Sequence, residues 1–258
     1  MYNHDLKLGR ALQHLHSLDA KIRMWGVEDY AYRFVPKLDD QSGKKIVRVE
    51  ILRPPPAEFG LIIGDCLHNL HSALDNLVYD LTVAYTETDP LPEECARDVA
   101  FPIFGDKPLK PRKCREMIGG IDPDAQTIIK DLQPHNRGDK YASDALWKLY
   151  KLSNVDKHRL LHLTVFTTDS FAHFPDAPER PRDLELWVHS SMENGAKIAQ
   201  YTPPPTETDT EVNMHVNFAF GVAFGQRSAA PGWRVVPTLR WLHSYIIREI
   251  SEPLRGFL

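Results

Sequence analysis

The sequence predicts an α+β protein, in which a helical bundle is built around one long central helix and carries an antiparallel sheet. Residues 57–85 show the strongest helical periodicity of the chain, and strictly alternating apolar residues predict strands elsewhere. Helices and strands also come in groups and not in a βαβ rhythm, which favours α+β over a doubly wound parallel sheet. We expect a single domain over 1–258, with its helical core at about 1–26, 57–158 and 238–252.

The 20 prolines of the 258-residue chain fall mainly between these segments and not within them. Proline lacks the backbone donor that helices and central strands need, so the proline-free stretches mark where regular structure can run. The proline excess therefore indicates long connecting loops.

The first element is a helix over about 1–26, because Leu8, Leu15 and Ile22 recur at helical spacing and Gly26 follows as a stop. A β-hairpin is expected over about 29–52. Its strands are indicated by alternation on both sides of a turn rich in Asp, Ser and Gly, through Tyr30, Tyr32, Phe34, Val47, Val49 and Ile51.

The central helix separates its residues into two faces. One arc of about 120° is apolar and holds Ile63, Cys66, Leu67, Leu70, Ala73, Leu74, Leu77, Val78 and Leu81. The opposite face, here called the polar arc, holds Asp65, His68, Asn69, Ser72, Asp75, Asn76 and Tyr79. So clean a division over so long a helix predicts a central packing element.

Shorter elements follow. Asp122 before Pro123 suits an N-cap for a helix over 122–132, and a second helix is expected over 143–152. Strands are expected over 160–166, 184–189 and 212–222, the last with Val212 and Met214 on its apolar face, and a final helix over about 238–252.

Composition and motifs exclude several classes of protein. No apolar run is long enough for a membrane span, and the evenly mixed first residues do not resemble a signal peptide, so we expect a cytoplasmic protein without a membrane partner. A net charge of −4 argues against a protein that mainly coats nucleic acid. Three cysteines without a CxxC pair indicate neither a disulfide framework nor a zinc ribbon. P-loop, Rossmann and α/β-hydrolase motifs do not occur, and we expect no cofactor.

The polar arc is the first candidate site. A carboxylate beside a histidine can orient the ring for acid–base work, and Asp65/His68 and His71/Asp75 have helical-neighbour spacing. Candidate catalytic residues are therefore Asp65, His68 and His71, and candidate binding residues are Asn69, Ser72 and Asn76. The alternatives are structural hydrogen bonding against another polar surface, and a solvated face; the arc lacks the Lys, Arg and Glu usual on solvated helices.

The second candidate is the polar segment 153–162, which precedes an apolar strand. Asp156, Lys157 and Arg159 are candidate binding residues, since Lys157 and Arg159 suit a phosphate, and His158 is a candidate acid or base. His158 and His162 have metal-ligand spacing only if this segment is helical. A polar helix-to-strand turn explains the same residues.

A basic run forms the third candidate, with five positive charges at Lys107, Lys110, Arg112, Lys113 and Arg115. Such a run can steer an anionic partner. Its flanking prolines also fit a solvated loop, which we favour.

Two of these segments carry a resemblance. GDCLHNLHSALDNLVYDL over 64–81 and LSNVDKHR over 152–159 resemble two signatures of a group of uncharacterised bacterial and phage proteins, with similar blocks at 101–104 and 121–134. In that group, the helix often has Arg at the position of His71 and His at that of Asn76. That Arg-x4-His spacing is similar to the motif of the HEPN helical ribonucleases of toxin and defence systems. Because both positions differ here, the resemblance implies a protein that binds RNA or a protein without cleavage, or one that uses other groups such as His68, His71 and His158.

Three functional hypotheses follow. The first is a HEPN-like module, associated with RNA or a nucleotide and belonging to a toxin or defence system, whose site combines the polar arc with residues 156–159. The second is a metal-dependent hydrolase that uses Asp65, His68 and His158 or His162. The third is a non-catalytic module whose polar arc packs against a partner or a second copy, as in a homodimer.

Overall fold

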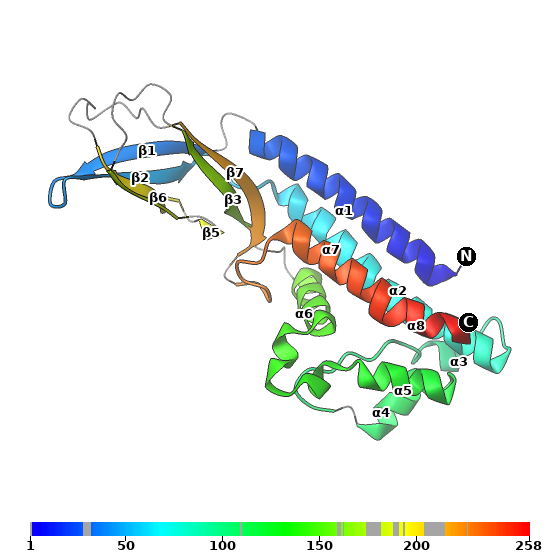
Figure 1. Ribbon diagram of the computed structural model, residues 1–258. Coiled ribbons are helices and arrows are strands. Elements are labelled where there is room, and N and C mark those ends of the chain that lie inside the picture. The colour runs from blue at the N-terminus through cyan, green and yellow to red at the C-terminus, as the bar shows by residue number, and fades with distance from the viewer. Residues whose placement is uncertain are drawn as a thin grey trace.

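The computed structural model has the α+β architecture that the sequence predicts (Figure 1). It describes residues 2–27, 32–108, 110–158, 161, 163–173, 182–187, 191–192, 194–203, 215–225 and 227–258. Strands lie at one end of a helical bundle, and both chain termini lie at the other end (Figure 1). There Arg255 donates to the carboxylate of Asp5 at 2.8 Å.

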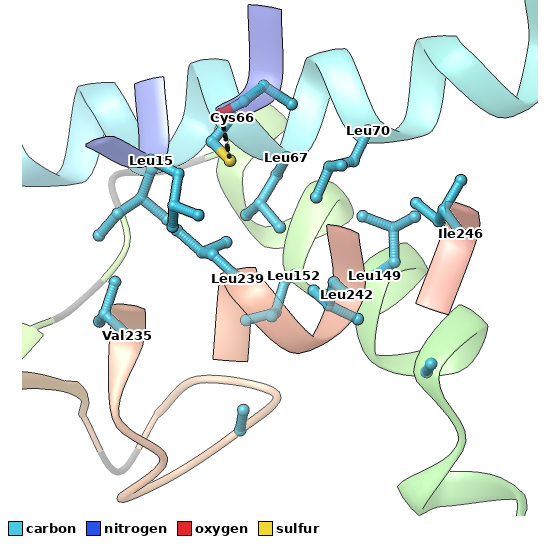
Figure 2. Close-up of a cluster of buried hydrophobic side chains, with 14 of the residues drawn as sticks. Leu15, Cys66, Leu67, Leu70, Leu149, Leu152, Val235, Leu239, Leu242 and Ile246 are labelled. Carbon is cyan, nitrogen blue, oxygen red and sulfur yellow. Dashed lines mark hydrogen bonds between the residues drawn. The ribbon is translucent and has the colours of Figure 1, made fainter. Parts of the chain in front are cut away.

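The bundle is formed by α1 (Asn3–Val27), α2 (Ala57–Thr86), α6 (Ala145–His158) and α7 (Val235–Tyr245), which pack against one another. Every member of the predicted apolar arc of α2 is buried. Figure 2 shows where leucines of the four helices meet, and there the Cys66 thiol donates to the Ala11 carbonyl oxygen at 3.5 Å. The predicted central helix and its core face are thus confirmed.

Smaller helices connect α2 to α6 along the chain. These are α3 (Glu93–Ala96), α4 (Pro111–Ile118), α5 (Pro123–Asp131) and the 3-10 segment η1 (Pro134–Ser143). As predicted, the side chain of Asp122 caps α5 by accepting from the Asp124 amide at 2.8 Å. At the end of the chain, α7 continues through η2 (Ile246–Ser251, π-helical), α8 (Glu252–Leu254) and η3 (Arg255–Phe257).

The described strands form two antiparallel sheets. The first has the order β1-β2-β6-β4, and the second the order β5-β3-β7. The strands are β1 (Tyr32–Asp39), β2 (Lys44–Ile51), β3 (Leu163–His173), β4 (Arg182–Leu186), β5 (Ser191–Met192), β6 (Lys197–Thr202) and β7 (His215–Phe224). The β1–β2 hairpin confirms the predicted one, with Phe34 opposite Val49 and a turn at Gly43, whose φ is +68°.

Several boundaries differ from the prediction. The helix expected over 143–152 begins at Ala145 and continues to His158, so the segment interpreted as a turn before a strand is helical up to that residue. The favoured loop for the basic run is wrong from Pro111 onward, because α4 begins there with proline at its first position, where the missing donor costs nothing. Strand β6 was not predicted. Tyr30, Val212 and Met214 lie outside the described residues.

Across the described part of the chain, every helix is too short or too polar to cross a bilayer.

Candidate functional site

The site begins at the contact between α2 and α6. Gly64 lies in the N-terminal third of α2, and a Cβ atom built on it would be 2.4 Å from Oδ1 of Asp156 on α6. Any larger residue would displace this carboxyl group. A glycine inside a helix costs about 1 kcal/mol relative to alanine, and here it lets a carboxylate lie directly against the backbone of the facing helix.

Beside this contact lies a cleft of about 170 Å³, here called the α2–α6 cleft. Its lining joins three members of the polar arc and the adjacent His71 to the second candidate segment: His68, His71, Ser72, Asp75, Ser153, Asp156 and Lys157. The two segments that the sequence singled out, almost ninety residues apart in the chain, therefore share one concave surface.

The carboxyl group of Asp156 has a raised pKa in this cleft. Partial burial raises the pKa of its carboxyl group above the ordinary value of 3.8, and repulsion by Asp65 raises it further, whereas His68 acts in the opposite direction. The carboxylate is consequently a stronger base than an exposed aspartate, and it stands beside an imidazole. A carboxyl and an imidazole within one cleft are suited to proton transfer.

Asp75 positions two other groups. Its Oδ2 is 3.4 Å from Nδ1 of His71, and its Oδ1 accepts a hydrogen bond from the Phe101 amide at 3.0 Å. The first contact orients an imidazole that lines the cleft, and the second ties the loop that follows α3 to α2. The predicted His71/Asp75 pair is therefore present.

Ser153 supplies a hydroxyl group that the sequence analysis did not select. The residue is 5% exposed, and its Oγ is buried without a hydrogen-bond partner among the described residues. Buried hydroxyl groups in proteins are nearly always paired, so this one has an unused capacity to donate or accept at the cleft wall.

Asp65, Asn69 and Asn76, which were predicted site residues on α2, do not line the cleft. The side-chain amides of Asn69 and Asn76 donate to the carbonyl oxygens of Asp65 and Ser72, one turn back on α2, at 2.8 and 2.7 Å. Their amide N–H groups thus make local hydrogen bonds within α2. Asp65 is exposed and acts on Asp156 through its charge.

The end of α6 departs from the prediction in a second way. His158 is exposed on the last turn and is absent from the cleft lining, whereas its neighbour Lys157 belongs to it. Arg159 and His162 lie outside the described residues.

The metal-site hypothesis finds no ligand cluster in the described part of the chain. No three His, Cys, Asp or Glu side chains described there are spaced to hold an ion, and the set Asp65, His68 and His158 does not converge. The variant of this hypothesis with His162 depends on a residue outside the described ranges.

Gly64 and Ser153 are the site residues that sequence reasoning missed. Ser153 precedes Asp156 by three residues, which places the two on one face of a helix, but the helix was expected to end at residue 152. Gly64 interrupts a segment whose other residues favour a helix, and an isolated glycine at such a position is a signal for a packing contact with another group.

In comparisons with known proteins, no family model, no curated protein and no solved structure matches this chain.

Proposed function

We propose that the protein is a cytoplasmic, HEPN-like RNA-associated module of a toxin or defence system, and that the α2–α6 cleft receives an RNA phosphodiester. The observation that carries the proposal is the shared lining of this cleft by His68, Asp156 and Lys157. These three side chains supply an imidazole, a carboxylate of raised pKa and a cation, the groups that metal-independent phosphodiester chemistry requires.

The three side chains can together catalyse the attack of a ribose 2′-hydroxyl on the adjacent phosphodiester. The Asp156 carboxylate removes the proton from a ribose 2′-hydroxyl, whose oxygen attacks the adjacent phosphorus. The bond from phosphorus to the 5′-oxygen breaks, and a protonated His68 gives its proton to that leaving oxygen. Lys157 balances the negative charge that builds on the phosphoryl oxygens. The products are a 2′,3′-cyclic phosphate and a 5′-hydroxyl, and no water is consumed.

This assignment differs from the HEPN pattern. The positions that would hold Arg and His in that pattern are His71 and Asn76 here, and only His71 lines the cleft. Proton transfer therefore falls to Asp156 and His68, with His71 held by Asp75 beside them.

An RNA assay tests the proposal. Labelled single-stranded RNA is incubated with the wild type and with His68→Gln and Asp156→Asn, with chelator present, and products and affinity are both measured. We expect the wild type to bind and to release cyclic-phosphate products, and each variant to lose about 10²–10⁴-fold in rate. The matched control is His16→Gln, an exposed histidine of α1 remote in sequence from the cleft.

Two results would count against parts of this assignment. Binding without cleavage would remove the acid–base step and leave an RNA-binding module. The absence of both RNA binding and RNA cleavage would overturn the proposal.

A further inference from the structure

The loop that Asp75 anchors also lines a second concave surface. This lysine–aromatic groove, of about 490 Å³, lies between the loop residues 103–108, the start of α4 with Lys110 before it, and helix α6. Three lysines of the basic run (Lys107, Lys110 and Lys113) and two rings of α6 (Trp147 and Tyr150) line it. Asp106 is the one acidic residue in its described lining, which gives the groove a formal charge of +2.

The lysines are not neutralised within the described part of the chain. The side chains of Lys107 and Lys110 have no ion pair or hydrogen bond there, and Lys113 has only a 4.0 Å contact with Glu116. Glu116 is already paired with Arg112 at 2.9 Å. The groove therefore offers positive charge to a partner from outside the chain.

The two rings form a stacked pair, here called the aromatic wall. Trp147 and Tyr150 are stacked, with centroids 5.3 Å apart and an angle of 21° between the planes. The wall is held in place, because Gly105 packs so closely on Trp147 that a Cβ atom there would be 2.5 Å from the indole ring. A rigid aromatic wall beside lysines matches the two repeating parts of a nucleic-acid strand, its bases and its phosphates.

The groove and the cleft are joined through α6. Tyr150 and Lys157 are seven residues apart, which is two helical turns, or about 10 Å along one face of the helix. The loop adds a second link, since Phe101 is bonded to Asp75 in the cleft and Ile103 and Phe104 line the groove.

We infer that the lysine–aromatic groove binds single-stranded RNA and leads it along α6 into the α2–α6 cleft. The groove as a binding surface stands on its own contacts, whereas its role in delivering RNA rests on the proposed function. An acidic polypeptide would also satisfy the lysines, but acidic side chains carry no aromatic ring to stack on the aromatic wall.

Fluorescence anisotropy with a labelled oligouridylate of about 12 nucleotides tests the inference. We expect the triple variant with Lys107→Gln, Lys110→Gln and Lys113→Gln to bind more weakly. Its slope of log affinity against log salt should fall by about 2, since each phosphate contact on a single strand contributes about 0.7. For single substitutions, Lys110→Gln should bind more weakly, whereas Arg112→Gln, an exposed and ion-paired position nearby on α4, should bind as the wild type does.

The aromatic wall is tested separately with Tyr150→Leu, which keeps an apolar side chain and should weaken binding about tenfold without changing the salt slope. Circular dichroism confirms that each variant is folded. Unchanged affinity in the triple variant overturns the inference. So does polyglutamate binding as tight as RNA binding together with an unaffected Tyr150→Leu variant, which would assign the groove to an acidic polypeptide.

The outcomes separate the groove from the cleft. If the triple variant binds and cleaves RNA as the wild type does, the groove assignment fails and the proposed function stands. If RNA binding depends on the lysines but no cleavage occurs and His68→Gln and Asp156→Asn bind unchanged, the groove stands and the cleft assignment fails.

Discussion

Replacing Gly64 with alanine tests the contact that builds the cleft. In a helix interior, Gly→Ala by itself stabilises by about 1 kcal/mol, because alanine loses less backbone entropy on folding. The new methyl group, however, would lie 2.4 Å from Oδ1 of Asp156, about 1 Å inside an ordinary contact, and overpacking of this kind costs about 1–3 kcal/mol. We expect a net effect between zero and about 2 kcal/mol of destabilisation.

Gly9 provides a matched control. It lies in the interior of α1, and nothing is within 4 Å of a Cβ atom built on it. Gly9→Ala should therefore show the propensity gain alone, about 1 kcal/mol or roughly 2–4 °C in Tm for a chain of this size.

A double-mutant cycle isolates the contact. The free energy of unfolding is measured in urea for the wild type, Gly64→Ala, Asp156→Ala and the double variant. Without the carboxyl group the alanine at 64 should stabilise as it does at 9, giving a coupling of about 1–3 kcal/mol. Effects that add to within about 0.5 kcal/mol would refute the close approach of Asp156 to α2.

Three further predictions concern the site and the core. The pKa of Asp156 is raised, so its carboxyl group holds its proton more tightly in the folded protein than in the unfolded chain. The ionised carboxylate therefore destabilises the fold at pH values above the raised pKa. This destabilisation is absent below the ordinary pKa of 3.8, where the group is protonated in both states. Asp156→Asn should thus raise Tm near neutral pH and leave it unchanged below pH 3.8, and a lower Tm near neutral pH would contradict this. Leu67→Ala should cost about 2–5 kcal/mol in urea unfolding, whereas Leu61→Ala, 58% exposed on the same helix, should cost about 0.5 kcal/mol or less; similar costs would contradict the assigned core face. Burial raises the pKa of the Cys66 thiol to about 12, so in thiol titration of the native protein it should stay unmodified at mildly alkaline pH while exposed Cys95 reacts, and equal rates would show that Cys66 is accessible.

The sequence predicted the fold most accurately where an apolar periodicity extended over many residues. The helix expected over 57–85 is observed as Ala57–Thr86, because its apolar arc alone specifies which face is buried. Short or polar segments were missed for a physical reason. Residues 153–158 have no apolar stripe, and their helix is supported by packing against α2, where Asp156 meets Gly64.

The cleft was predicted as a pairing of two segments but not residue by residue. The spacing on α2 correctly indicated His71 beside Asp75. It did not show that Asn69 and Asn76 donate to their own helix, nor that Lys157 lines the cleft while His158 does not. Those distinctions depend on how two helices are rotated against each other, which no local pattern specifies.

The most direct measurement of the central claim is histidine side-chain NMR during titration with oligouridylate. The His68 signal is assigned by its loss in His68→Gln, and exposed His16 on α1 serves as an internal reference. If RNA enters the α2–α6 cleft, the His68 signal should shift saturably with the binding curve while that of His16 stays in place. A His68 signal that does not move while RNA saturates the protein would contradict the assignment of the cleft.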